Sequence, residues 1–380
     1  MPATYSQSIL GATDFSPQIT NDISVITQNW FVNRTPLLAR LPRVPVGRVD
    51  FQTISRTPRP RTATLGAAVA NNTVGTVTLI DVSPFMVDDV LELASGERVQ
   101  ITSLDLANNT ASVTRGVSGT TAAAQNNATS VLLIGNARTG AAVDQAAIAA
   151  VPTAVTQYCQ TFQHPVQVGG SLASTTNFQV EEGQRAPFDQ FKMEALRNLV
   201  DDIEYTTYYG LGDAGTTTGR PQQKGLKSLI ASGNVVTDPT NKGAYTAYDF
   251  VRDAFTNARA NGGEPDVVLL SSNFMTGLAK WGHAVQRLDA GATAFGTPID
   301  VFEAPFLGGV KIIEAPLLRS FTAVALTSEH VRFRTKRNEF WSPRGVRGDA
   351  IEGDWIAEMA VEVGNPAFHA WVEGITVFSA

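Results

Sequence analysis

The sequence has little of what marks several common classes of protein. Its 380 residues include a single cysteine, Cys159, so no intramolecular disulfide can form. The N-terminal stretch MPATYSQSIL has neither the basic segment nor the apolar core of a secretory signal, and no apolar run approaches the roughly 18 residues of a membrane span. We therefore expect a chain that is made in a reducing cytosol and has no membrane partner.

Charged residues are scarce as well. Only 17% of the residues are charged, below the roughly 25% of an average protein, and the formal net charge is −6 at pH 7. A low charge density fits a protein that buries much of its surface against copies of itself. The negative balance argues against tight, salt-sensitive wrapping of nucleic acid, which requires a basic face.

Motifs that would indicate catalysis are missing too. There is no Walker loop, G-x-S-x-G elbow or zinc spacing, Cys159 has no neighbouring base, and the histidines lie far apart. Residues 210–215 match G-x-G-x-x-G, but they follow a predicted helix and lead into a loop, whereas dinucleotide binding needs a preceding strand. We predict that the chain is not an enzyme and has no catalytic residue, cofactor or metal. The four histidines are His164, His283, His330 and His369.

The positive charge that the chain does have is concentrated in residues 28–62. This segment contains seven arginines against one acid, Asp50, and its five prolines block a continuous helix and confine any strand to an edge. Its apolar residues are too scattered for an amphipathic helix, so the segment has no core of its own. It must lie on later domains of the same chain or on a neighbouring copy, and a long tethered arm of this kind suggests a subunit of an assembly.

A second group of basic residues lies near the C-terminus. Two interpretations stay open for it: a solvated face, or a contact with carboxylates of a neighbouring copy. Its members are Arg332, Arg334, Lys336, Arg337, Arg344 and Arg347.

Residues 63–137 have a different character, rich in threonine, valine, asparagine and glycine. Turn signals at Ser95-Gly96 and at 107–109, with about 10 residues between turns, indicate a small antiparallel barrel or sandwich that is inserted in the chain. The flanking segments 47–55 and 154–169 are extended and could pair as a ribbon, which alone would be marginal in water. The predicted strands of the insertion are 77–82, 87–93, 98–104, 110–114 and 130–134.

The C-terminal two thirds are predicted to be α+β. Residues 187–209 form the clearest helix, because apolar residues recur at helical spacing between Pro187 and Gly210. Thr246 with Asp249 is a capping-box pattern that begins a second helix. Core strands are predicted at 266–270, 311–314 and 323–326, and residues 355–363 and 367–378 are expected to pair with each other across a turn at 364–366.

The order of these elements resembles the major capsid proteins of tailed bacteriophages, whose fold is shared with encapsulin shells and with the floor of herpesvirus capsids. The likeness is to the branch with a β domain inserted in the extended loop. The stretches that carry it are VDFQTI at 49–54, LELASGERVQITSL at 91–104, SVTRGVSGTTAAA at 112–124, TQYCQTFQHPVQVGGS at 156–171, DIEYTTYYGLG at 202–212, KGLKSLI at 224–230 and AVEVGNPAFHAWVEGI at 360–375.

The resemblance implies a domain organisation and a function. It places an N-terminal arm at 1–45, an extended loop at 46–169 with the β insertion at 63–137, and an axial domain at 221–325. The peripheral domain would comprise 170–220 and 326–380, with its spine helix at 187–209. Copies of the chain would assemble into pentamers and hexamers of an icosahedral head shell around the viral DNA.

The same resemblance implies partners and a location. The main partner would be the chain itself, with portal, scaffolding and decoration proteins as further partners, and double-stranded DNA would be enclosed without sequence-specific binding. The protein would be part of the virion and would be assembled in the cytoplasm of a bacterial host. We hypothesise that these arginines contact carboxylates of neighbouring subunits: Arg34, Arg40, Arg43, Arg48, Arg56, Arg59, Arg61, Arg344 and Arg347.

Three alternatives remain at this point. One is an encapsulin-like nanocompartment that holds enzyme cargo, which only genome context or the packaged contents would separate from a virion. Another is a glycan-binding adhesion protein that uses residues 63–137, although Phe85 is the one aromatic residue there and no tryptophan or tyrosine platform is present. The last is an enzyme that uses the loop at 210–215, which a measurable nucleotide affinity would support.

Overall fold

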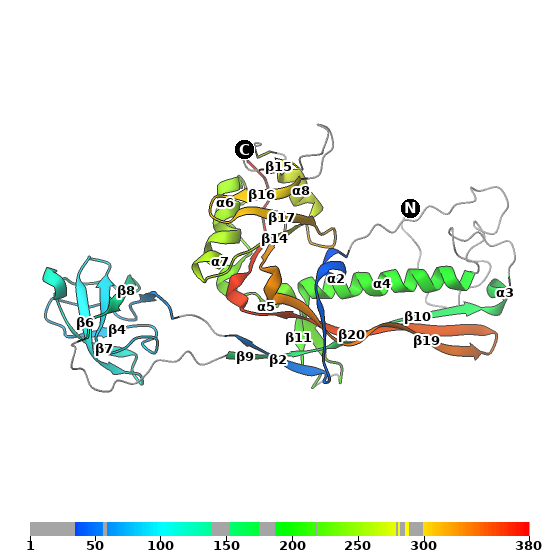
Figure 1. The fold of residues 1–380 in the computed structure, drawn as a ribbon, viewed down its shortest axis with the longest axis horizontal. Helices are drawn as coiled ribbons and strands as arrows, with labels where there is room; N and C mark the ends of the chain where they lie inside the picture. The colour runs from blue at the N-terminus through cyan, green and yellow to red at the C-terminus, as the bar shows by residue number, and fades with distance from the viewer. Residues whose placement is uncertain are drawn as a thin grey trace. The chain divides into compact units, whose positions relative to one another are not determined.

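The protein folds into two compact units. The computed structural model describes residues 35–55, 59–138, 153–174, 187–216, 219–278, 280–281, 286–288 and 299–379. Unit 1 comprises Met1–Ser55 with Ala154–Ala380, and unit 2 comprises Arg56–Thr153. The chain therefore leaves unit 1, builds unit 2 and returns (Figure 1). The mixture of helices and strands agrees with the predicted α+β class.

A four-stranded sheet and a long helix make up one part of unit 1. The helix α4 (Pro187–Tyr209) has the predicted bounds and lies along one face of this sheet (Figure 1). Its residues Phe191, Ala195, Leu199 and Ile203 recur every four positions and are buried, so one stripe of the helix faces the strands. The strand order is β1 (Arg43–Pro45), β19 (Val331–Arg347), β20 (Ala350–Val363) and β10 (Gln160–Gly169), with β1 parallel to β19 and the other pairs antiparallel.

A seven-stranded mixed sheet makes up the other part of unit 1. Its central strand β14 (Val267–Leu270) alternates, with Leu269 in the core shared with α4 and with Val268 and Leu270 in a second, aromatic core. The sheet therefore separates two cores. The order is β13 (Val235–Val236), β21 (Ala370–Val372), β18 (Ala323–Leu326), β14, β17 (Gly308–Glu314), β16 (Ile299–Ala304) and β15 (Gln286–Leu288).

Short helices surround this second sheet. The predicted capping box is confirmed: the Thr246 hydroxyl accepts from the Asp249 backbone N–H, and the Asp249 carboxylate accepts from the Thr246 backbone N–H. The helical stretch that follows packs Phe250 and Phe255 into the aromatic core. It consists of α6 (Ala247–Val251), a π-helical turn η4 (Arg252–Thr256) and α7 (Asn257–Ala260); the other short elements are α3 (Gly170–Ala173), α5 (Leu226–Leu229), α8 (Ser272–Leu278), η3 (Ser232–Asn234), η6 (Ser328–His330) and η7 (Pro366–Phe368).

The expected pairing of 355–363 with 367–378 is wrong. The strand β20 pairs with β19 on one side and β10 on the other, whereas β21 joins the second sheet between β13 and β18. At Gly364 and Asn365 the chain does turn, with Asn365 in a left-handed conformation (φ 48°), but the turn leads from one sheet to the other. Turn signals fix a change of direction, but they do not specify which strand becomes the neighbour.

Two small ribbons complete unit 1. The strands β2 (Asp50–Ser55) and β9 (Thr153–Tyr158) form a two-stranded sheet, as predicted for segments 47–55 and 154–169. After α4, the strands β11 (Leu211–Asp213) and β12 (Gln222–Lys224) form a hairpin. The G-x-G-x-x-G match at 210–215 therefore lies at a helix end and in a hairpin, and it has no strand before it.

Unit 2 is a six-stranded antiparallel barrel. Backbone hydrogen bonds from Gly66 to Thr78 (2.9 Å) and from Ile80 to Thr64 (3.0 Å) join the two outer strands of the sheet and close it. The interior is filled by apolar side chains such as Leu91, Val99 and Ile101. The strand order is β3 (Thr62–Thr64), β8 (Ser130–Asn136), β5 (Asp89–Leu93), β6 (Arg98–Asp105), β7 (Thr110–Thr114) and β4 (Thr76–Thr78), with a short turn η2 (Val117–Gly119).

The expectation that residues 1–45 are irregular is wrong for their last part. Residues 1–34 lie outside the described residues, but Pro36–Arg40 form the short helix α2 and Arg43–Pro45 form β1. Leu37 and Leu38 are buried in the core that contains α4. The segment therefore folds because distant parts of unit 1 supply the hydrogen bonds and apolar surface that it lacks locally.

A buried histidine joins the two connections between the sheets of unit 1. His369 Nε2 lies 3.1 Å from the carbonyl oxygen of Gly364, which only accepts, so this nitrogen donates. Its Nδ1 then accepts from the Thr327 backbone N–H at 3.2 Å. Thr327 lies between β18 and β19, and Gly364 lies between β20 and β21. Neutral imidazole is required for this arrangement, and burial lowers the pKa of His369 to about 4.

This predicts a loss of stability in acid. Because the pKa of His369 is about 4 in the folded chain and near 6.5 in the unfolded chain, its contribution is complete above pH 6.5 and declines as the pH falls towards 4. Between pH 7 and pH 4 this amounts to about 3 kcal/mol. Urea unfolding of unassembled H369Q should lack that part of the pH dependence, while H330Q should retain it. An unchanged pH profile in H369Q would contradict the assignment.

Candidate functional site

The N-terminal segment docks on α4 through a buried carboxylate. Glu204 is fully buried, and its two carboxylate oxygens accept from the backbone N–H groups of Leu37 and Leu38, both at 2.9 Å. The hydroxyl of Tyr208, one turn further along α4, donates to the same carboxylate at 2.7 Å. Thr35 makes no side-chain cap, so Glu204 caps the first turn of α2 from another part of the chain. Burial raises the pKa of Glu204, and the three donors act against that rise.

An ion pair fixes the next part of the same segment. Both terminal nitrogens of Arg43 bond to Glu339 on β19, at 2.7 and 3.0 Å. A hollow of about 420 Å³ lies between this ion pair and α4, with Leu196, Val200 and Trp355 in its lining. The hollow contains no nucleophile beside a base, so it indicates a packing surface and carries no catalytic chemistry.

A charged cluster holds the ribbon of β2 and β9 against the four-stranded sheet. Glu362 on β20 is buried and accepts from Arg332 and Arg334 of β19, with both Nε–Oε2 distances 2.5 Å. Thr53 of β2 donates to Glu362 at 3.3 Å, and Gln157 of β9 donates to Thr53 at 3.3 Å. Two residues before Thr53, the ring of Phe51 lies 5.9 Å from the Arg334 guanidinium. The ribbon therefore begins at a polar junction whose carboxylate is shared by three strands.

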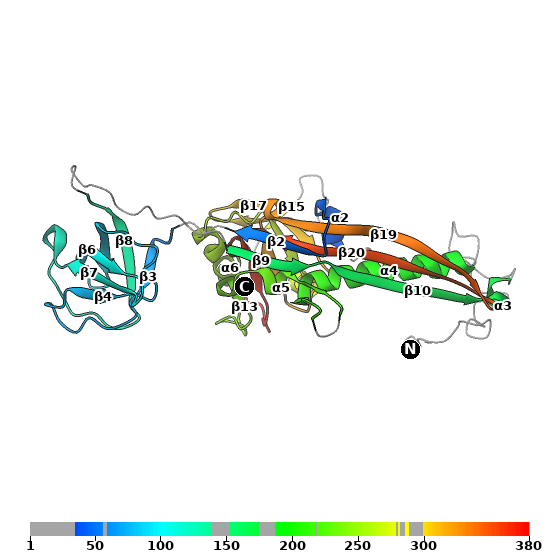
Figure 2. The ribbon, with the colours of Figure 1, turned by 90° about the horizontal axis from the view of Figure 1, so that it is seen from below.

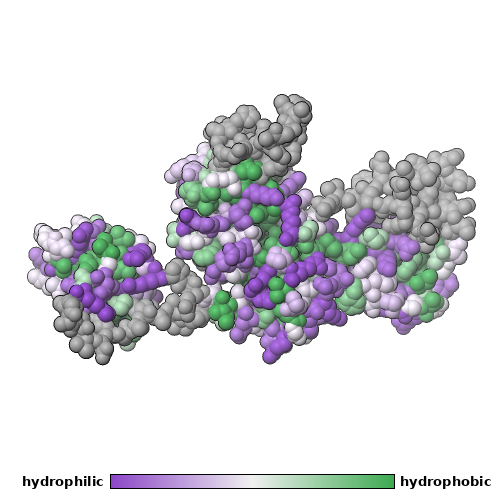
Figure 3. Space-filling view, viewed as in Figure 1, coloured by the Kyte–Doolittle hydropathy of each residue, from purple (hydrophilic) through white to green (hydrophobic). Residues whose placement is uncertain are grey.

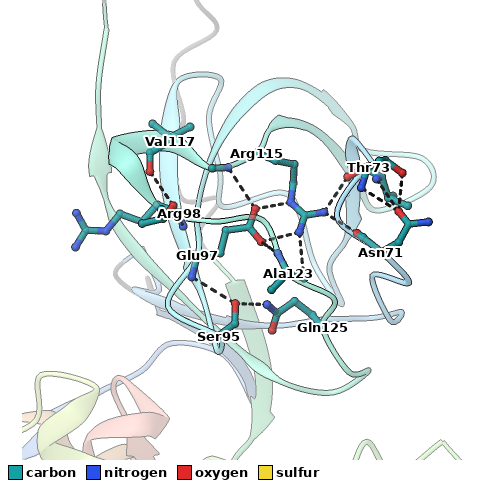
Figure 4. A network of polar contacts seen from close by, with 12 residues as sticks. Asn71, Thr73, Ser95, Glu97, Arg98, Arg115, Val117, Ala123 and Gln125 are labelled. Carbon is teal, nitrogen blue, oxygen red and sulfur yellow. Dashed lines mark hydrogen bonds and ion pairs between the residues drawn. The ribbon is translucent and has the colours of Figure 1, made fainter.

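The barrel of unit 2 contains its own buried ion pair (Figure 4). Two guanidinium nitrogens of Arg115 bond to the Glu97 carboxylate at 2.5 and 2.6 Å, and the side chains are 8% and 0% exposed. The remaining donors of Arg115 reach the backbone carbonyls of Asn71, Val74 and Ala123. Burial opposes the charge of Glu97, but hydrogen bonds from Arg115 and Ala123 hold its pKa below the usual value. The pair ties three loops together at one end of the barrel.

A second buried acid joins the two ends of the barrel segment. The carboxylate of Asp89 is fully buried and forms an ion pair with Arg59, which precedes β3. The same carboxylate accepts from the Asn136 side chain at 3.0 Å, at the end of β8. The incoming and outgoing parts of the chain are therefore held by one side chain of unit 2.

The described residues offer no site for catalysis. Within them, no group of three or more His, Cys, Asp and Glu side chains is arranged to hold a metal ion. Cys159 is buried, and burial raises the pKa of its thiol to about 11, which makes it a poor nucleophile at neutral pH. No helix in the described part of the chain is long and apolar enough to cross a membrane.

Exposed apolar residues are scattered over the surface. Figure 3 shows a mosaic of hydrophilic and hydrophobic residues on one face, without a continuous apolar area over the coloured part. The most exposed large apolar side chains include Leu211 (83%), Tyr248 (74%) and Val346 (72%), which belong to different elements. Contacts with other molecules would therefore be divided among many small areas.

Comparison with known families assigns this fold. The model of the SU10 major capsid protein family matches residues 4–376. The chain belongs to the SU10 major capsid protein family. As a major capsid protein it is a component of the virion and self-assembles into the icosahedral shell. No curated protein matches the sequence.

Solved structures show the same fold at low sequence identity. The chain is similar to the Phage G gp27 major capsid protein structure, with TM-score 0.52, 9% identity and coverage of 97% of this chain and 100% of that chain. It is similar to a Microbacterium phage Oxtober96 structure, with TM-score 0.50, 9% identity and coverage of 93% and 95%. It is also similar to the SrpI encapsulin of Synechococcus elongatus PCC 7942, with TM-score 0.50, 10% identity and coverage of 96% of each chain.

The arginines predicted to contact other subunits of this capsid protein fall into three groups. Arg34 and Arg56 lie outside the described residues. Four form ion pairs within the chain: Arg43 with Glu339, Arg48 with Asp50, Arg59 with Asp89 and Arg344 with Asp354. Arg40, Arg61 and Arg347 are exposed and form no ion pair with any other described residue. Their predicted role between subunits stays a prediction.

Sequence reasoning missed the acids that organise these sites. Glu204 lies between Val200 and Tyr208 at helical spacing, and Glu358 and Glu362 interrupt the otherwise apolar end of β20. A carboxylate in a buried position requires a donor nearby, and this was the available signal. The second basic group proves to be largely paired with these acids in the same chain: Arg332 and Arg334 with Glu362, and Lys336 and Arg337 with Glu358.

Removing the Glu204 carboxylate should release the N-terminal segment. In E204A, two buried backbone N–H groups and the Tyr208 hydroxyl lose their acceptor, at a cost of about 1–3 kcal/mol for each group left unsatisfied. Hydrogen exchange at Leu37 and Leu38 should accelerate strongly while exchange in β14 stays slow. D202A is the matched control, because that carboxylate is on the same helix and its side chain is 62% exposed. Equal protection of Leu37 in both variants would refute the docking role.

Two arginines of the barrel should differ in their importance. R115A leaves the buried Glu97 without its partner, which costs about 3–5 kcal/mol. R98A removes a pair with Glu92 in which both side chains are at least one third exposed, at a cost of about 0–1 kcal/mol. Hydrogen exchange of the β5 and β6 amides in the full chain measures both. Similar costs for the two variants would contradict the importance given to the buried pair.

Proposed function

We propose that this capsid protein assembles as pentamers and hexamers whose subunits are held together by the N-terminal arm and the extended loop. In this proposal residues 1–45 are the arm, 46–169 the extended loop with its insertion at 63–137, and 221–325 the axial domain. The peripheral domain comprises 170–220 and 326–380, with α4 as its spine helix. The ribbon of β2 and β9 supports this proposal, because its exposed Ile54 (67%) is available to a neighbouring subunit.

We further propose that the shell encloses double-stranded DNA and has no enzymatic activity. The chain would be assembled in the cytoplasm of a bacterial host, with portal, scaffolding and decoration proteins as additional partners. The absence of a nucleophile–base pair at the hollow beside Arg43 supports a purely structural role. The contents of purified particles distinguish this proposal from a nanocompartment, because DNA would be found in one case and a protein cargo in the other.

The arginines proposed at subunit boundaries are those named from the sequence. Arg40, Arg61 and Arg347 are the strongest members of the set, because each is exposed and unpaired within the described part of the chain. Arg43, Arg48, Arg59 and Arg344 already have partners in the same chain, so they would contribute through their remaining donors. Each contact would be weak, and linkage in one chain would make the set effective.

Charge reversal tests this arrangement. R40E combined with R347E should leave folded, soluble subunits but lower the yield of closed shells by about tenfold or more, because each boundary would bring like charges together. R259E is the control, since Arg259 pairs with the exposed Glu264. Sedimentation and negative-stain electron microscopy give the yields, and circular dichroism checks the fold. Normal shell yield from the double variant would reject the role of these two arginines.

A further inference from the structure

The four-stranded sheet of unit 1 has one face that α4 does not cover. Side chains alternate between the two faces of a strand, so Val331, Phe333 and Thr335 of β19 point into the core with α4. Arg332, Arg334 and Lys336 therefore belong to the opposite face. Figure 2 views the molecule from below, with β19, β20 and β10 in front of α4.

The carboxylates of this face are buried and its cations are exposed. Glu362 and Glu358 have side chains that are 4% and 5% exposed. The cations that cover them are more accessible. The exposed side-chain fractions are 44% for Arg332, 21% for Arg334, 31% for Lys336 and 45% for Arg337. We call these four residues the basic ladder.

The basic ladder keeps an excess of positive charge. Its four cations are opposed by two carboxylates, which leaves a net charge of +2. Although burial opposes ionisation, hydrogen bonds from Arg332 and Arg334 hold the pKa of Glu362 below its usual value, so the acid stays charged and the ladder stays ordered. The next ion pair on this hairpin, Arg344 with Asp354, is neutral in sum.

We propose that the basic ladder contacts the phosphate backbone of the packaged double-stranded DNA and that this face of the sheet points into the shell. The proposal rests on the proposed function, in which the shell encloses DNA. The whole chain has a net charge of −6, so attraction to DNA is confined to such local positive areas and stays weak and independent of base sequence.

The chemistry of the ladder favours phosphate over the surface of a second protein. Alternate residues of a strand are about 6.6 Å apart, so the cations form a regular row. Protein interfaces contain an apolar centre and have few lysines. Between Arg332 and Arg337, the described residues of this face include no exposed apolar side chain, since Ala360 of the neighbouring strand is buried. A row of cations without an apolar centre matches the repeating charge of a duplex.

A double variant can remove the excess charge and leave every buried acid paired. R332Q with R337Q keeps Arg334 on Glu362 and Lys336 on Glu358. The control is K242Q with R259Q, which removes the same charge from cations whose partners, Asp238 and Glu264, are 70% and 71% exposed. The affinity of unassembled subunits for a fluorescent 30-base-pair duplex is measured as a function of NaCl concentration.

The salt dependence reports the number of phosphate contacts. If Arg332 and Arg337 each contact a phosphate, the slope of log K against log salt should be smaller in magnitude by about 1.8 in the double variant. The control should keep the wild-type slope. No measurable binding by the wild type at low salt, or the same slope in the double variant, would overturn the proposal.

Shell formation, scored in the same preparations by electron microscopy, separates this inference from the proposed function. Wild-type shells that form without any DNA binding by subunits would leave the capsid role intact and reject the ladder as a DNA contact. A double variant that binds DNA normally but forms no shells would also reject it, because the face would then belong to a contact between copies of the chain.

Discussion

Glu204 is buried in α4 and is satisfied only when the N-terminal segment is in place. A carboxylate without its donors in this position would cost several kilocalories per mole, so the segment and the helix depend on each other. The segment in turn carries β1, which adds a strand beside β19, and Arg43, which pairs with Glu339. One buried charge therefore connects the start of the described chain with the long helix and with the sheet beneath it.

The same arrangement recurs where other parts of the chain meet. Glu362 joins β19 and β20 to the ribbon, and Glu97 joins three loops of the barrel. Each of these acids accepts from donors that belong to different segments, and each is charged because the donors outweigh the cost of burial. Directional bonds of this type fix how segments meet more sharply than apolar contact alone.

Local structure was predictable where the signal is local. The helix at 187–209 follows from its apolar spacing and its flanking residues, and the capping box at Thr246 follows from two residues three positions apart. Strand neighbours were not predictable, because β20 reads equally well as a partner for any extended segment, and the hairpin expected at 364–366 turned out to lead into another sheet. The helix α2 depends on Glu204, which is 167 residues away from Leu37, and no local pattern could reveal it.

Asp89 gives the barrel a property of its own. Because one side chain holds both Arg59 and Asn136, the two points at which the polypeptide enters and leaves the barrel stay together regardless of what surrounds them. β2 and β9 are likewise paired with each other in unit 1. A shorter or longer module, or a bare turn, can occupy the space between these two strands during evolution without any change to the register of the remaining sheets. The insertion is a cassette, and its diversification is uncoupled from the architecture that builds the shell.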